Sequence, residues 1–110
     1  MMQNIINQIL KFRDDRNWKQ FHNPKDLAIS LSLETSELLE VFQWSGRDTE
    51  CNDKIEKIKE ELADVIIYSI LMADACNLDI DEIIQKKLSI NNEKYPVQKA
   101  YGSSKKYSDF

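Results

Sequence analysis

The amino-acid sequence predicts an all-α protein, a bundle of four helices that assembles with further copies of itself. Two glycines and two prolines occur among its 110 residues, so the turns that an all-β fold needs are scarce. Apolar residues make up 42% of the chain and charged residues 31%, as in a soluble globular domain with one modest core. Over long stretches the apolar residues recur every three to four positions, which is the period of an amphipathic helix.

Two helices are expected in the N-terminal half. The first covers residues 3–15, where isoleucine and other apolar residues repeat at helical spacing. The second begins after Asn23, whose side chain can cap the free amides, and has Pro24 at its first helical position. It is expected to run to about Trp44, where a polar loop containing a glycine follows.

The third helix is expected over residues 52–75, with Asn77 as its terminator. Its middle, residues 62–73, is apolar almost all round, which in a soluble chain requires burial on more than one side. A four-helix monomer of this size cannot cover such a surface well. The sequence therefore predicts a homodimer or homotetramer.

The fourth helix is expected to begin at Asp79, which has capping-box spacing with Glu82, and to end before Pro96. Residues 97–110 are polar and show no period. They are expected to form a C-terminal tail outside the catalytic domain, which is assigned to residues 1–96.

The composition argues against several classes of function. The chain has 15 basic and 19 acidic residues, a net charge of −4, and no long basic run, so no binding to a nucleic-acid backbone is expected. No apolar run is long enough to cross a membrane and no signal-peptide core opens the sequence, so the cytoplasm is the expected location. Two cysteines without a CxxC pair, together with a single histidine, cannot build a zinc cluster.

Two pairs of acidic residues carry the expected chemistry. Glu34 and Glu37 are three residues apart on the second helix, and Glu61 and Asp64 are three apart on the third. Glu34 falls within the apolar stripe of its helix, which is an unusual place for a carboxylate.

If the two helices pack antiparallel, the pairs can face each other around one cavity. Oxygen ligands alone favour Mg²⁺ or Mn²⁺, and the Glu-x-x-His motif of di-iron bundles is missing. The spacing alone leaves two interpretations open, a metal site and a solvated acidic face.

Four ordered segments carry a family resemblance: 16–24 (RNWKQFHNP), 34–44 (ETSELLEVFQW), 60–68 (EELADVIIY) and 91–96 (NNEKYP). Together they closely resemble the MazG-like nucleotide pyrophosphohydrolases, with the dCTP pyrophosphatase group as the nearest branch. The resemblance implies an all-α bundle, assembled as a dimer or a dimer of dimers, that cleaves a (deoxy)nucleoside triphosphate such as dCTP into the monophosphate and pyrophosphate. It also implies that Glu34, Glu37, Glu61 and Asp64 are the Mg²⁺ ligands.

The motif positions also suggest catalytic and substrate-binding residues. Either Glu37 or Glu40 would orient or deprotonate the attacking water, and the sequence does not choose between them. Aromatic residues at these positions would form a slot for the base, and polar ones would contact the sugar and phosphates. The expected substrate-binding residues are Trp18, Lys19, Gln20, Phe21, His22, Trp44, Lys57, Tyr68, Asn91, Lys94 and Tyr95.

Alternatives remain for these assignments. The lysines can instead be solvated, the tryptophans can cover the core, and His22 can act as a local cap. Some eukaryotic members of the family have a histidine where this chain has Ile9, so the base preference does not carry over. Two other functions are alternatives: a non-catalytic helical adaptor, and a related hydrolase of dUTP or of phosphoribosyl nucleotides.

Overall fold

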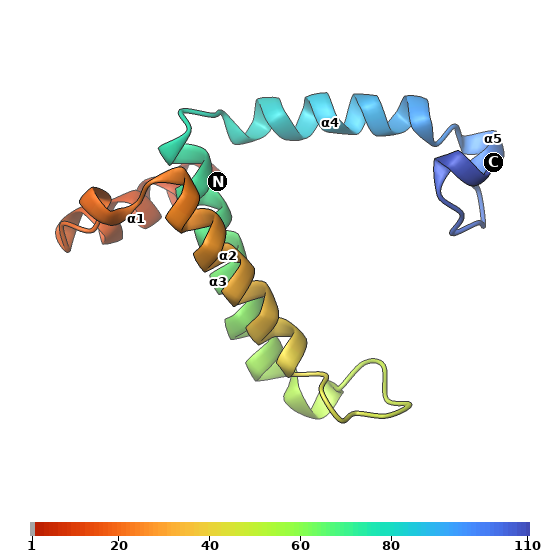
Figure 1. Cartoon of the computed structure of the whole chain (residues 1–110), viewed down its shortest axis with the longest axis horizontal. Coiled ribbons are helices and arrows are strands. Elements are labelled where there is room, and N and C mark those ends of the chain that lie inside the picture. The colour runs from red at the N-terminus through yellow and green to blue at the C-terminus, as the bar shows by residue number, and fades with distance from the viewer. Residues whose placement is uncertain (1) are drawn as a thin grey trace. The chain divides into compact units, whose positions relative to one another are not determined.

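Figure 1 shows the computed structural model of the chain, which describes residues 2–110. Every regular element in that range is a helix, as the sequence predicts. The chain forms two compact units, one ending at Asn77 and the other comprising Leu78–Phe110. The predicted domain boundary at residue 96 stays a prediction.

The first helix, α1 (Met2–Asp15), agrees closely with its predicted range. Its end is fixed by the backbone carbonyl of Arg13, which accepts the N–H groups of Arg16 at 3.2 Å and Trp18 at 3.1 Å. Asn17 between them is left-handed, with φ 55°. This reversal leads into the short 3₁₀ helix η1 (Lys19–Phe21).

The second helix, α2 (Pro24–Glu40), begins where the sequence predicts. Asn23 caps it, because its Oδ1 accepts the N–H of Asp26 at 2.9 Å. The predicted end at Trp44 is wrong by about one turn. After Glu40 the backbone N–H groups donate to carbonyl groups only three residues earlier, so the α-helix gives way to turns. Trp44 then adopts a left-handed φ of 67°.

The third helix, α3 (Ile55–Ala75), follows a short 3₁₀ helix, η2 (Asn52–Lys54), so its predicted start was three residues early. It ends as predicted, with Asn77 left-handed at φ 56°. Figure 1 shows α2 and α3 running side by side with the connecting loop at one end. The helices form an antiparallel hairpin, and α1 packs against α3.

The loop of this hairpin is fixed by its own hydrogen bonds. The Asp48 carboxylate accepts the backbone N–H groups of Glu50 at 3.2 Å and Cys51 at 3.0 Å. Lys54 Nζ donates to the Val41 carbonyl at 3.2 Å and thereby ties the start of α3 to the end of α2. These contacts set the register in which the two helices face each other.

The core of the first unit is small. Its buried apolar side chains are Leu27, Val41, Cys51, Ile70, Leu71 and Ala73. Large apolar side chains on α2 and α3 stay exposed, including Leu33 at 60% and Leu62 at 45%. A single copy of the chain therefore leaves much of the apolar surface of the hairpin uncovered.

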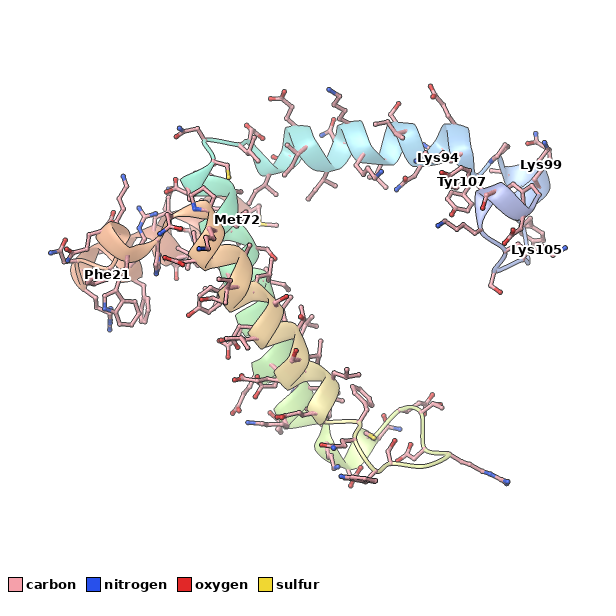
Figure 2. The ribbon with its side chains drawn as sticks, in the orientation of Figure 1. Phe21, Met72, Lys94, Lys99, Lys105 and Tyr107 are labelled. Atoms are coloured by element: carbon pink, nitrogen blue, oxygen red, sulfur yellow. The ribbon has the colours of Figure 1, made fainter. Side chains whose placement is uncertain are left out.

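The second unit contains α4 (Ile80–Lys94), α5 (Val97–Ala100) and the 3₁₀ helix η3 (Tyr107–Asp109). As predicted, Asp79 caps α4 by accepting the N–H of Glu82 at 3.1 Å. Residues 97–110, expected to form a polar tail without a helical period, contain the short helix α5 and fold back, because Tyr95 packs edge-on against both Tyr107 and Phe110. Figure 2 shows Lys94 beside Tyr107, with Nζ 4.8 Å from the ring centre.

No helix within residues 2–110 combines the length and the apolar character needed to span a bilayer.

Candidate active site

The α2–α3 hairpin brings four carboxylates together. Glu34 and Glu37 project from α2, and Glu61 and Asp64 project from α3. One oxygen from each side chain lies within 4.8 Å of the others. We call these four residues the carboxylate cluster.

Burial makes this cluster different from a solvated acidic face. Glu61 is only 6% exposed, and Glu34 and Asp64 are half-buried. The Oε2 atoms of Glu34 and Glu61 are closed off from solvent and have no hydrogen-bond partner. Buried carboxylate oxygens without a partner are costly, so both atoms are available to a cation.

The charges in the cluster perturb one another. The negative charge of Glu34 raises the pKa of Glu37, and hydrogen bonds with Glu61 and Glu34 add to the increase. The pKa of Glu61 is lowered, chiefly because Lys57 donates a hydrogen bond to it, with the Lys57 Nζ to Glu61 Oε1 distance 2.9 Å. The cluster therefore holds more negative charge than its single lysine partner balances.

The donor set fits a hard divalent cation. All four side chains offer carboxylate oxygens, which Mg²⁺ and Mn²⁺ prefer, and no cysteine or histidine belongs to the cluster. Two of the oxygens, Glu34 Oε2 and Glu61 Oε2, are buried and have no hydrogen-bond partner. Glu34, Glu37, Glu61 and Asp64 are thus the residues that could hold such an ion.

Two cavities of different character adjoin the cluster. The larger, which we call the apolar cavity, has a volume of about 670 Å³ and is lined mainly by apolar side chains of α1 and α3, with Glu34 and Asp64 at its wall. The smaller, the polar cavity, measures about 410 Å³ and is lined by Glu37, Glu40, Val41, Lys57 and Glu61. The four carboxylates are therefore divided between the two cavities.

The structure brings some of the other expected site residues into these cavities. Trp18, His22 and Tyr68 line the apolar cavity, and Glu40 and Lys57 line the polar one. The Nδ1 atom of His22 is closed off from solvent without a partner, and burial, together with the charge of Arg13, lowers the pKa of this imidazole. Burial is the main cause that raises the pKa of Tyr68, and the nearby carboxylates raise it further.

Other expected residues line neither cavity. Lys19 and Gln20 lie on the turn after α1 together with Phe21, which is 63% exposed and labelled in Figure 2. Trp44 is 92% exposed in a single copy. Asn91, Lys94 and Tyr95 belong to the second unit, so their substrate-binding roles stay predictions.

Helix α1 contributes more to the apolar cavity than the sequence predicts. The residues of α1 that line the apolar cavity are Ile5, Gln8, Ile9, Phe12 and Arg13. The apolar members follow the helical period and resemble ordinary core residues. No local pattern could have identified Arg13, because its partner Asp74 is 61 residues away.

Comparison with known proteins gives a consistent result. Residues 29–110 match the model of the MazG-like family. The chain is 37% identical over 105 residues to dCTP pyrophosphatase 1 of Mus musculus and 36% identical over 104 residues to the Homo sapiens protein of that name. Each match covers 90% of this chain, which spans 61% of the length of these relatives.

A solved structure is similar over most of its length. It is the crystal structure of a pyrophosphatase from Archaeoglobus fulgidus, with 36% identity and a TM-score of 0.81. The match covers 86% of this chain and 92% of that one. Together, the family model and this relative show that the chain belongs to the MazG-like family.

Proposed function

We propose that the protein is a Mg²⁺-dependent nucleoside triphosphate pyrophosphohydrolase, which converts a (deoxy)nucleoside triphosphate into the monophosphate and pyrophosphate. The observation that carries the proposal is the position of the carboxylate cluster between an apolar cavity and a polar one. The names of the relatives make dCTP the first substrate to assay.

The two cavities suit the two ends of such a substrate. The apolar cavity offers Trp18 and Tyr68 to a base, and its volume of about 670 Å³ is within the range of small-molecule sites. The polar cavity offers the ammonium group of Lys57 to the terminal phosphates. A triphosphate bound in this way has its α-phosphorus at the carboxylate cluster.

The carboxylate cluster would hold the metal through Glu34, Glu37, Glu61 and Asp64. When bound, Mg²⁺ supplies charge neutralisation at the phosphate oxygens and a lowered pKa for coordinated water. Water attacks the α-phosphorus, the bond from that phosphorus to the bridging oxygen breaks, and pyrophosphate leaves with the electron pair. Glu37 and Glu40 are the two candidates for accepting the proton of the water, since both line the polar cavity.

The test is a product analysis with matched variants. The wild-type protein is incubated with a panel of NTPs and dNTPs, with Mg²⁺ or with EDTA, and pyrophosphate and monophosphate are expected only with Mg²⁺. Glu61→Gln should abolish turnover, whereas Glu60→Gln, a change one residue away at a side chain that is 72% exposed, should leave it intact. Release of inorganic phosphate instead of pyrophosphate would contradict the proposed reaction.

Two further outcomes decide between the alternatives. Absence of turnover with every nucleotide would favour a non-catalytic adaptor. Comparison of Glu37→Gln with Glu40→Gln identifies the proton acceptor. A variant that loses both activity and metal binding has lost a metal ligand. A variant that loses activity but still binds the metal has lost the proton acceptor.

We also propose that the protein works as a homodimer or homotetramer. The support is the exposed apolar surface of the α2–α3 hairpin, which includes Leu33, Leu39 and Leu62. Exposed apolar side chains that gather on neighbouring helices are typical of a protein interface. Light scattering coupled to size-exclusion chromatography should give a mass of at least twice 12.9 kDa.

A further inference from the structure

Lys57 binds one oxygen of the most deeply buried side chain in the carboxylate cluster. Its Nζ lies 2.9 Å from Glu61 Oε1, and the two residues are four apart on α3. The lysine side chain is 60% exposed and that of Glu61 only 8% exposed, and both residues line the polar cavity. One of the two oxygens of Glu61 is therefore already bound to an ammonium group.

The other oxygen of Glu61 has a different environment. Its Oε2 atom is closed off from solvent and has no hydrogen-bond partner. A buried carboxylate oxygen in this state is costly unless a cation or a donor satisfies it. As long as Lys57 holds Oε1, Glu61 can give a cation Oε2 alone.

The number of oxygens that a carboxylate gives to a metal ion distinguishes Mg²⁺ from Ca²⁺. Mg²⁺ is small, requires nearly octahedral geometry and is usually bound by few carboxylates together with water and substrate phosphates. Ca²⁺ is larger, accepts more oxygen ligands and often takes both oxygens of one carboxylate. A carboxylate that is limited to one oxygen therefore disfavours Ca²⁺ more than Mg²⁺.

We propose that Lys57 is a positioning residue that limits Glu61 to one metal-binding oxygen and thereby makes the carboxylate cluster selective for Mg²⁺ over Ca²⁺. The inference rests on the metal site of the proposed function. A hydrogen-bond partner behind a metal ligand fixes the orientation of that ligand, and its removal changes metal affinity by about ten- to hundredfold. An ammonium group has more than one N–H donor, so the bond to Glu61 leaves others for the phosphates of the substrate.

Removal of Lys57 tests the proposal through metal binding alone, without a substrate. The variant is Lys57→Met, which keeps an unbranched side chain and removes the donor. The full-length protein is titrated with Mg²⁺ or Ca²⁺, and the Kd for each ion is taken from the rise in melting temperature above that of the same protein in EDTA. The lost positive charge affects two divalent ions alike, so the ratio of the two Kd values isolates the positioning of Glu61. The Kd for Ca²⁺ divided by the Kd for Mg²⁺ should fall by about tenfold in Lys57→Met.

Two matched variants complete the comparison. Lys57→Arg keeps a charged donor beside Glu61, so neither ion gains a second oxygen and the ratio should stay at the wild-type value. Lys59→Met makes the same change two residues further along α3, at a lysine whose partner is Glu56 at 2.9 Å, and should also leave the ratio unchanged. A ratio that is unchanged in Lys57→Met, or that falls as far in Lys59→Met, would overturn the proposal.

A structure with bound metal gives a test that requires no variant. Crystals of the wild-type protein grown with Mn²⁺, which anomalous scattering locates, should show one oxygen of Glu61 on the metal and Lys57 Nζ still bound to the other. Two oxygens of Glu61 on the metal would overturn the proposal. Failure of the wild-type protein to bind any of these ions would refute both the metal site and the role of Lys57, whereas metal binding with an unchanged ratio in Lys57→Met would refute the role of Lys57 alone.

Discussion

Replacement of Asp64 by asparagine should remove the stabilisation that Mg²⁺ gives the folded protein. Asp64 is half-buried in the carboxylate cluster, and the change keeps its shape while it removes one of four charged ligands. A cation that binds only the folded state stabilises it by RT ln(1 + [Mg²⁺]/Kd). At about 100 times the wild-type Kd this stabilisation is about 2.7 kcal/mol, and a hundredfold weaker site in the variant reduces it to about 0.4 kcal/mol.

Thermal unfolding with and without Mg²⁺ measures the difference. The wild-type melting temperature should rise by about 10 °C on adding Mg²⁺, and that of Asp64→Asn by less than about 2 °C. In EDTA the variant should melt at or above the wild-type temperature, since it carries one fewer repelling carboxylate. The matched control is Asp53→Asn, which makes the same change at an exposed residue and should keep the full response to Mg²⁺. An unchanged response in Asp64→Asn would refute the assignment of the metal site.

Three other perturbations test separate parts of the structure. Leu33→Glu places a charge on the exposed apolar surface of α2 and should shift the mass in light scattering toward the monomer, while Lys25→Glu, an exposed change near the start of the same helix, should not. The NMR titration of His22 should have its midpoint below about 6.5, because burial and the charge of Arg13 lower the pKa of the imidazole in the folded protein. The unfolded chain therefore binds more protons than the folded protein, and the free energy of unfolding should fall as the pH drops below about 6.5. Backbone N–H groups of Cys51 and Glu50 lower the pKa of Asp48, so Asp48→Ala should melt earlier than wild type at pH 7, and the difference should shrink as acid protonates Asp48.

The starts of the helices were predictable because capping is a local property. Asn23 and Asp79 each accept a backbone N–H three residues later, and both signals can be read from neighbouring residues. The end of α2 was less visible, because the hairpin loop decides it through contacts such as that of Lys54 with the Val41 carbonyl, 13 residues apart. The fold of the C-terminal segment was missed for the same reason, since it depends on Tyr95 meeting Tyr107.

The two ends of the candidate site differ in how far the sequence predicts them. The carboxylate cluster consists of two pairs, each three residues apart on one helix, so helical periodicity and an antiparallel hairpin suffice to anticipate it. The part of the apolar cavity that Arg13 lines depends on the ion pair of Arg13 with Asp74, a pairing between α1 and α3 that no spacing rule encodes. The residues proposed for phosphate cleavage thus follow from local pattern, whereas the lining that α1 gives to the apolar cavity depends on tertiary contact. The residues of α1 that line the apolar cavity can therefore change without any change in the four carboxylates.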